Sequence, residues 1–306
     1  MLFPGQGVQY INMLSCFFKK EKLFQNTFNE ASEYIGCNLI KLIQEGPLKK
    51  INNSTYTQPI ILTASIAIYK FWKKCNGKNP SFMSGHSVGE YSALVCANAL
   101  KFSDALRILS LRGKYMQKVT LNRSYLVKAI IGLNKNIIKK ICKKYTSNTV
   151  SIASINSDNQ IIISGDNIHV HQASLDCKKN GARCILDVNL NIPVHSDFMK
   201  PVAKKIQHIL KNIEIKKPKI PVINNVDVKC EQNSKNIKKA LIKQVYKTVR
   251  WQEIIDFIQS KNIFTMLEIG PNKILTNLNK KNINLIALNT SNNKYFFQAL
   301  KVINYK

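Results

Sequence analysis

The 306-residue sequence has few acidic residues and no closely spaced pair of cysteines. Its 17 aspartates and glutamates stand against 46 lysines and arginines, which gives a formal net charge of +29. The eight cysteines are scattered and never occur as Cys-x-x-Cys, so the sequence predicts neither a metal site of the zinc type nor a disulfide framework. Unpaired cysteines are typical of a reducing compartment, and we expect the chain in the cytoplasm.

Long apolar runs are also missing. No stretch reaches the roughly 18 consecutive apolar residues that a membrane-spanning helix needs, and the first residues do not lead from a charged segment into an apolar one. We therefore expect neither a membrane segment nor an export signal. The hydrophobic content of 45% is ordinary for a globular protein, so a sizeable core, divided between two lobes, is expected.

Arginine is scarce, because it stands at only five positions while lysine is spread along the whole chain. Proteins that bind nucleic acid usually concentrate their positive charge and interleave it with arginines and aromatic residues. The dispersed lysines therefore favour compositional drift over a nucleic-acid partner. A charge of this size also suits an anionic membrane or an acidic protein partner.

The apolar pattern divides the chain into two kinds of segment. From about residue 126 the order is strand, helix, strand, strand, helix, strand, as in a ferredoxin-like unit. On either side, helices alternate with short apolar strands, which is typical of a mostly parallel sheet covered by helices. We predict an α/β fold in which a small ferredoxin-like lobe, residues 123–191, is inserted into a larger α/β lobe, residues 1–122 and 192–306.

Residues 85–89 read Gly-His-Ser-Val-Gly and fit the G-x-S-x-G pattern of a nucleophile elbow. An apolar strand is predicted before them, at 81–84, and a helical pattern follows them, as the elbow requires. Ser87 is therefore the candidate nucleophile, and the backbone N–H of Val88, at the start of the helix, is the natural donor to a developing oxyanion. The alternative is an ordinary turn, since glycines also flank serine in turns by chance.

Among the five histidines, His195 is the best candidate for a general base. It follows a turn at Pro193, in a loop between a predicted strand and a helix, where α/β folds place catalytic groups. A capping or packing role for His195 stays open, because a serine and its base meet only in three dimensions. His86 adjoins the candidate nucleophile and is expected to point away from it, and His169 and His171 lie on a helix without a third metal ligand.

Arg112 lies on the apolar face of a predicted helix, residues 103–118. Its helical neighbours are Leu109, Tyr115, Ile108, Met116 and Ala105. A guanidinium that points inward needs a partner to offset its desolvation. The alternatives are an internal ion pair or a snorkelling side chain on one hand, and a planar fork that binds a substrate carboxylate through two hydrogen bonds on the other.

Several motifs together resemble those of the bacterial malonyl-CoA:acyl-carrier-protein transacylases. They are FPGQG at 3–7, GHSVGEYSAL at 85–94, RGKYMQ at 112–117 and HSDFMKP at 195–201, with QPIILTAS at 58–65, PVINNVDVK at 221–229, QVYKTVRW at 244–251 and EIGPNKILTNL at 268–278. They cover nearly the whole chain, in the order found in that family. The resemblance implies that the larger lobe is α/β hydrolase-like.

The resemblance also implies an activity. The chain would move a malonyl group from malonyl-CoA to the phosphopantetheine thiol of acyl carrier protein, in fatty acid biosynthesis, by a ping-pong cycle through a malonyl ester of Ser87. His195 would take and return the proton, and the backbone carbonyl of Gln244 would orient its ring. No metal and no bound cofactor is implied, since the coenzyme A thioester is a substrate.

By the same resemblance, the backbone N–H groups of Gln6 and Val88 would form the oxyanion hole, and Arg112 would bind the free carboxylate of the malonyl group. Three other functions remain open from the sequence. They are a related transferase with another acyl-CoA donor, a thioester hydrolase, and a non-catalytic remnant that binds carrier protein or nucleic acid through its positive surface.

Overall fold

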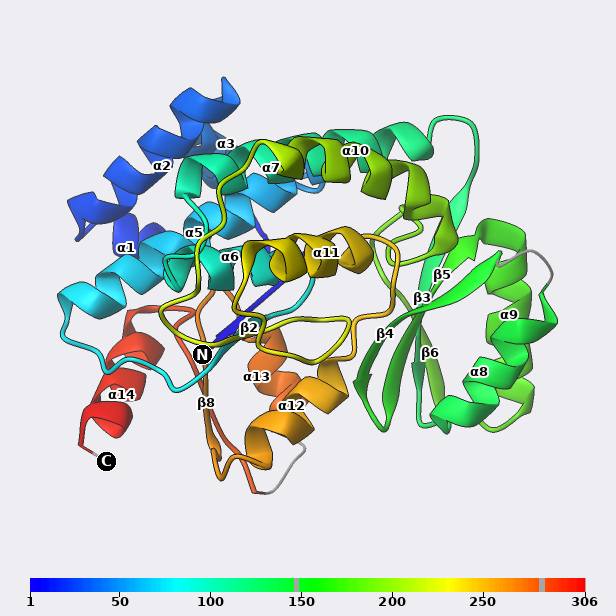
Figure 1. The fold of residues 1–306 in the computed structure, drawn as a ribbon. Helices are drawn as coiled ribbons and strands as arrows, with labels where there is room; N and C mark the ends of the chain where they lie inside the picture. The colour runs from blue at the N-terminus through cyan, green and yellow to red at the C-terminus, as the bar shows by residue number, and fades with distance from the viewer. Residues whose placement is uncertain (146–148, 281–283, 306) are drawn as a thin grey trace.

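The computed structural model describes residues 1–145, 149–280 and 284–305, and their two sheets lie in two lobes (Figure 1). The larger lobe holds a five-stranded sheet in the order β7-β2-β1-β8-β9, and all neighbouring strands are parallel. Its strands are β1 (Leu2–Phe3), β2 (Met83–Gly85), β7 (Val222–Ile223), β8 (Thr265–Glu268) and β9 (Ile286–Asn289). The mostly parallel sheet predicted from the sequence is confirmed.

Helices cover both faces of this sheet. The helices of the larger lobe are α1 (Ser15–Phe18), α2 (Lys22–Ile35), α3 (Leu39–Glu45), α4 (Leu48–Ile51), α5 (Ser54–Lys74), α6 (Val88–Cys96), α7 (Phe102–Val119), the 3₁₀-helix η2 (Asp197–Met199), α10 (Lys200–Lys211), α11 (Ser234–Gln244), α12 (Trp251–Gln259), α13 (Ile274–Asn279) and α14 (Asn293–Asn304). Consecutive side chains on a strand point to opposite faces. Phe3 accordingly packs in the apolar cluster of α5, α6 and α7, and Leu2 packs in the cluster of α12 and α13. The short central strand is thus buried on both sides.

The smaller lobe is an antiparallel sheet in the order β4-β5-β3-β6, with two helices packed against it. Its elements are β3 (Tyr125–Ile131), α8 (Lys135–Lys144), β4 (Val150–Ser157), β5 (Gln160–Asp166), α9 (Asn167–Lys179) and β6 (Cys184–Asp187). The predicted β-α-β-β-α-β order is confirmed. The elements fall inside residues 123–191, and the limits of the lobe at those two residues stay a prediction.

The two lobes meet close to the elbow. β4 of the small lobe forms an isolated parallel bridge, Ser154 with Val249, to the segment before α12. Two backbone hydrogen bonds support the bridge, from Ile155 N to Val249 O at 3.0 Å and from Val249 N to Ala153 O at 2.9 Å. The junction therefore places the small lobe over the end of β2, where the elbow lies.

The strand before the elbow lies slightly later than the sequence predicts. It was expected at 81–84 and spans Met83–Gly85. Within β2, the two residues of β1 pair with Ser84 and Gly85, so the hydrogen-bonded part of the strand shifts toward the elbow. In the described ranges no helix has both the length and the apolar character to cross a membrane.

Candidate active site

The elbow brings Ser87 to the carboxyl edge of the parallel sheet. Ser87 precedes the first residue of α6 and has φ 52° and ψ −108°, a conformation that non-glycine residues seldom adopt. Glycine is required on both sides of it. A Cβ on Gly85 would lie 1.9 Å from the carbonyl carbon of Gly89, and a Cβ on Gly89 would lie 2.1 Å from the carbonyl oxygen of Phe3. The chain can therefore turn sharply against β1 with the serine at the apex.

Ser87, His195 and the carbonyl of Gln244 form a hydrogen-bonded row. His195 Nε2 lies 2.9 Å from Ser87 Oγ, and its Nδ1 lies 2.7 Å from the backbone oxygen of Gln244. A carbonyl oxygen can only accept, so Nδ1 carries the ring proton and Nε2 has its lone pair toward the serine hydroxyl. The sequence could not show that these three groups meet, because 108 residues separate the serine from the histidine.

The environment keeps His195 uncharged. The pKa of His195 is lowered to about 3, first by burial and then by the nearby Arg112 and His86, although backbone hydrogen bonds act in the opposite direction. The ring is therefore neutral at every pH near neutrality and is ready to accept a proton from Ser87. The positive charge of Arg112 disfavours the protonated ring and so makes the imidazole a weaker base.

Arg112 points inward, as its helical position predicts, and is 1% exposed. Its Nη1 donates to Gln58 Oε1 at 2.9 Å, and its Nη2 lies 3.5 Å from Ser87 Oγ. Across the described residues no aspartate or glutamate forms an ion pair with it, and its Nε has no hydrogen-bond partner. The internal ion pair considered from the sequence is thus not found there, and the guanidinium keeps spare donors beside the serine.

Gln58 is a site residue that sequence analysis missed. It is fully buried on α5, and its Nε2 donates to the side chain of Gln6 at 3.0 Å. It therefore connects Arg112 to the turn that carries the Gln6 backbone N–H. Its signal in the sequence was an amide directly before the apolar run of the helix, since a buried amide must find partners.

Asn225 is a second missed residue. It follows β7, which lies beside β2, and it is fully buried. Its Oδ1 accepts from the backbone N–H of Ser87 and its Nδ2 donates to the carbonyl of Gly85, both at 2.7 Å. The side chain therefore holds the elbow from both sides of the serine. The pair Asn224-Asn225 after an apolar strand was its only signal.

A cavity of about 640 Å³ opens between the lobes at Ser87. Gln6 and His195 line it from the larger lobe, and Gln160 and Leu186 line it from the smaller one. The leading N–H groups of a helix have no acceptor within the helix, so the N–H of Val88, the first residue of α6, is available beside Ser87. The cavity has the size of a small-molecule site.

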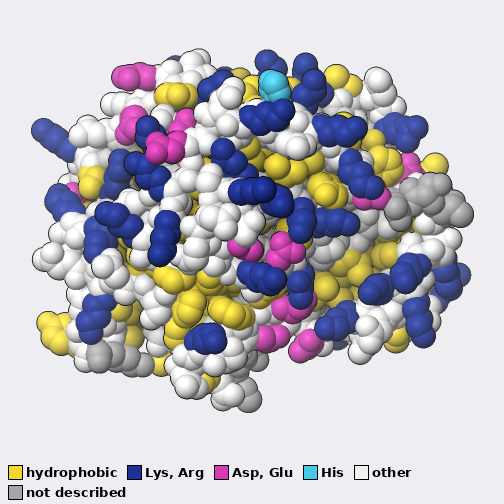
Figure 2. All heavy atoms as spheres, viewed as in Figure 1, with side chains coloured by type: hydrophobic (Ala, Val, Ile, Leu, Met, Phe, Trp, Pro, Cys, Tyr) yellow, Lys and Arg dark blue, Asp and Glu magenta, His cyan; other side chains and the backbone are white. Residues whose placement is uncertain are grey.

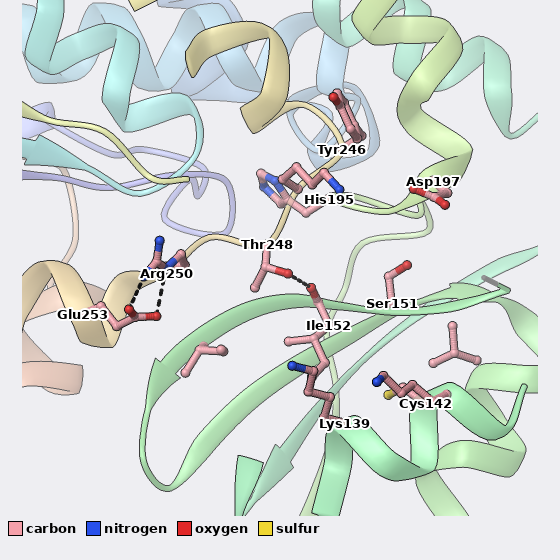
Figure 3. A pocket seen from close by; sticks show the side chains of 14 residues that line it. Lys139, Cys142, Ser151, Ile152, His195, Asp197, Tyr246, Thr248, Arg250 and Glu253 are labelled. Atoms are coloured by element: carbon pink, nitrogen blue, oxygen red, sulfur yellow. Dashed lines mark hydrogen bonds and ion pairs between the residues drawn. The ribbon is translucent and has the colours of Figure 1, made fainter. Parts of the chain in front are cut away.

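His195 also lines a second cavity, of about 560 Å³ (Figure 3). Three lysines, Lys139, Lys143 and Lys247, contribute to its lining. Thr248 Oγ1 donates to the carbonyl of Ile152 at 2.7 Å and ties the loop after α11 to β4. The segment that carries Gln244 is thus anchored to the small lobe.

The other histidines are not gathered into a metal site. His86 points away from the cavity serine, as predicted, and its Nε2 lies 3.1 Å from Ser154 Oγ and 3.1 Å from Asn156 Oδ1. Burial lowers the pKa of His86 to about 4. His169 contacts Asp166 at 3.1 Å. No cluster of three or more histidine, cysteine or acidic side chains with metal-binding geometry occurs within residues 1–145, 149–280 and 284–305.

Comparison with known proteins gives a consistent result along the chain. The family model described as "Acyl transferase domain" matches residues 1–291. The malonyl CoA-acyl carrier protein transacylase of Buchnera aphidicola subsp. Schizaphis graminum is 62% identical over 304 residues, 99% of this chain and 98% of that protein. The protein of the same name from Escherichia coli strain K12 is 39% identical over 292 residues, 95% of this chain and 94% of its own length.

Solved structures match the whole fold. A structure of a type II PKS acyl-carrier protein in complex with its malonyl-transacylase superposes with a TM-score of 0.96 and 40% identity, covering 99% of this chain and 98% of that one. The malonyl CoA-acyl carrier protein transacylase of Coxiella burnetii gives a TM-score of 0.96 at 35% identity, covering 99% of this chain and 96% of that one.

Proposed function

Because the chain belongs to the acyl transferase domain family, we propose that it moves a malonyl group from malonyl-CoA to the phosphopantetheine thiol of acyl carrier protein, in fatty acid biosynthesis. The observation that carries this proposal is the buried guanidinium of Arg112, whose Nη2 lies 3.5 Å from the hydroxyl of Ser87 and whose Nε has no hydrogen-bond partner. Malonyl is an acyl group that ends in a free carboxylate. A guanidinium beside the nucleophile is the partner that such a group needs.

The first half-reaction forms an ester on Ser87. Neutral His195 takes the hydroxyl proton through Nε2 while Oγ attacks the thioester carbonyl carbon. The backbone N–H groups of Gln6 and Val88 donate to the oxyanion of the tetrahedral intermediate. When the intermediate collapses, the carbon–sulfur bond breaks and His195 returns the proton to the departing thiol of coenzyme A.

The second half-reaction runs in the opposite direction with a different thiol. The phosphopantetheine thiol of the carrier protein gives its proton to His195 and attacks the ester carbonyl. The intermediate collapses with return of the proton to Ser87, and malonyl leaves on the carrier. The carbonyl of Gln244 keeps the histidine in one tautomer throughout, because it accepts from Nδ1 in both steps.

The surface charge suits an acidic partner. Figure 2 shows lysine and arginine side chains spread over the viewed face of both lobes, with few acidic side chains among them. An acidic carrier protein would be attracted to such a surface, and the attraction would raise the rate of encounter. The even spread does not form the arginine-rich stripe of a nucleic-acid binder, which supports the carrier as partner.

We place this activity in the cytoplasm on the basis of the thiols. All eight cysteines are free in the structure, and three of them, Cys96, Cys142 and Cys177, are buried. A protein whose fold uses no disulfide is compatible with a reducing compartment. Fractionation of cells that produce the chain, followed by immunoblotting, tests this placement.

A transfer assay tests the proposed function. The chain is incubated with malonyl-CoA and carrier protein that bears phosphopantetheine, and malonyl-carrier is measured by intact-protein mass spectrometry. Wild type should produce malonyl-carrier and the Ser87→Ala variant should not. Release of free malonate at the same rate with and without carrier would instead identify a thioester hydrolase, and binding of carrier without any acyl transfer would identify a non-catalytic remnant.

A further inference from the structure

A buried carboxylate lies beneath the elbow. Glu90 is the third residue of α6 and is 2% exposed. Its Oε2 accepts two hydrogen bonds, from Gln244 Nε2 at 2.8 Å and from Asn225 N at 3.0 Å. Burial raises the pKa of Glu90 to about 7, and nearby Asp227 raises it too, whereas the two hydrogen bonds and the charge of Arg112 lower it. An apolar side chain would fill this space without that desolvation cost. A carboxylate is therefore needed here to accept the two hydrogen bonds.

The two donors to Glu90 belong to the residues that hold the elbow. Asn225 contacts the N–H of Ser87 and the carbonyl of Gly85. Gln244 Nε2 donates to the carbonyl of Ser87 at 2.9 Å. Ser87 has a sparsely populated backbone conformation, which persists only where surrounding contacts over-determine it. The side chains of Asn225 and Gln244 supply such contacts.

Gln244 also links Glu90 to the base, because its backbone carbonyl accepts from His195 Nδ1. We propose that Glu90 is a positioning residue for acyl transfer: its Oε2 fixes Asn225 and Gln244, and through them it sets both the Ser87 elbow and the carbonyl that orients His195. The inference rests on the proposed function only in that malonyl is taken as the acyl group that is transferred. The arrangement of nucleophile and base that it concerns can be tested without that group.

Two substitutions separate the acceptor from the volume of the side chain. Glu90→Met keeps a similar volume and removes both acceptor oxygens, whereas Glu90→Gln keeps one carbonyl oxygen for the two donors. Glu268 provides a matched control. It lies on β8, is 1% exposed, has a pKa raised by burial to about 7, and accepts from Thr276 N and Oγ1, both at 2.7 Å, away from the elbow.

The first readout is the rate at which a fluorophosphonate probe labels Ser87, since this reagent needs the nucleophile and base but not the malonyl group. We expect Glu90→Met to slow labelling by about 100-fold, the effect of a displacement near 1 Å in a reacting group. Glu90→Gln should recover most of that rate, and Glu268→Met should label like wild type. In malonyl transfer, kcat should fall in Glu90→Met while KM for malonyl-CoA stays within about threefold, because the variant retains Arg112 and its hydrogen bond to Gln58.

The second readout is the proton NMR signal of the His195 Nδ1–H, which reports its hydrogen bond to Gln244. Glu90→Met should shift or broaden this signal although residue 90 does not touch the histidine, and Glu268→Met should leave it in place. If Glu90→Met does not fold by circular dichroism, Gln244→Leu tests the same link, because it removes Nε2 and keeps the backbone carbonyl. It should then slow labelling by roughly tenfold or more.

Three results would overturn the inference: labelling of Glu90→Met or Gln244→Leu at the wild-type rate, labelling of Glu90→Gln as slow as that of Glu90→Met, or an equal loss in Glu268→Met. Wild type that reacts with the fluorophosphonate but not with malonyl-CoA would overturn the proposed function and leave the positioning role open to the same comparison. Wild type that reacts with neither would overturn both.

Discussion

Arg112 of α7 and Ser87 of the elbow before α6 lie side by side, with Nη2 of the guanidinium 3.5 Å from the serine Oγ. An acyl group esterified to Ser87 must therefore extend next to a buried positive charge. Under the proposed function, a malonyl group would place its free carboxylate there and complete an ion pair. An acetyl group leaves the guanidinium without that partner, so the arrangement favours acyl groups that carry a carboxylate.

Removal of the guanidinium should change which acyl-CoA the protein prefers as acyl donor. In Arg112→Ala, kcat/KM for malonyl-CoA should fall by about two orders of magnitude, which is the scale of losing one partner of a buried charge pair, and acetyl transfer should rise relative to malonyl transfer. Both donors are measured in the same transfer assay. Arg107→Ala, on the exposed face of the same helix, is the control and should keep wild-type selectivity. Unchanged selectivity in Arg112→Ala would contradict the role given to Arg112.

Gln58 should matter for both binding and chemistry, because its amide holds Arg112 on one side and Gln6 on the other. We expect Gln58→Ala to raise KM for malonyl-CoA and lower kcat, with a combined loss of roughly 10- to 100-fold in kcat/KM, since a charged donor is left unpaired. Ser65→Ala is the control on the same helix. Its buried hydroxyl has no hydrogen-bond partner in the described chain, so its loss should leave the kinetics unchanged. Equal kinetics for both variants would count against the Gln58 bridge.

Gly113 lets α7 approach α5 closely. A Cβ at this position would lie 2.1 Å from the carbonyl oxygen of Ser54. Gly113→Ala should therefore separate the helices that carry Arg112 and Gln58, and it should lower the free energy of unfolding by about 1–3 kcal/mol. Urea denaturation measures this loss. The neighbouring exposed Lys114→Ala should change stability by less than about 0.5 kcal/mol, and an equally small effect of Gly113→Ala would show that the contact is not close.

The buried Glu268 should make the free energy of unfolding depend on pH. Its pKa is raised from 4.5 to about 7, so between these pH values the folded protein holds a proton that the unfolded chain has released. Stability from this group is therefore present below pH 4.5 and is lost as the pH rises through 7. Glu268→Gln removes this term. Its unfolding free energy should rise with pH, relative to wild type, by up to about 1.4 kcal/mol per pH unit between pH 5 and 7. Parallel curves for the two proteins would contradict the raised pKa.

Local sequence patterns were sufficient for the features that depend on one element. The spacing on a single helix predicted that Arg112 points inward, and the glycines of residues 85–89 predicted the elbow. The alternation of strands and helices predicted the small lobe. In each case the periodicity of one segment determines the geometry, so no knowledge of the other segments was needed.

Residues that depend on the packing of several elements could not be predicted in the same way. Asn225 reaches the serine because β7 pairs with β2. The apolar pattern of a strand does not determine which strand lies next to it in a parallel sheet. Glu90 follows Ser87 by three residues and looks like an ordinary acidic residue in the first turn of a helix. Its two donors come from residues 225 and 244, which only the tertiary structure brings to it.

The central claim is that Ser87 carries the malonyl group between the two thiols. The most direct test incubates the protein with malonyl-CoA in the absence of carrier protein and looks for the adduct by peptide mass spectrometry. The mechanism predicts a malonyl ester on the peptide that contains Ser87, which disappears when carrier with a free phosphopantetheine thiol is added. Folded protein that gains no adduct on Ser87, or gains one that the carrier does not remove, would contradict it.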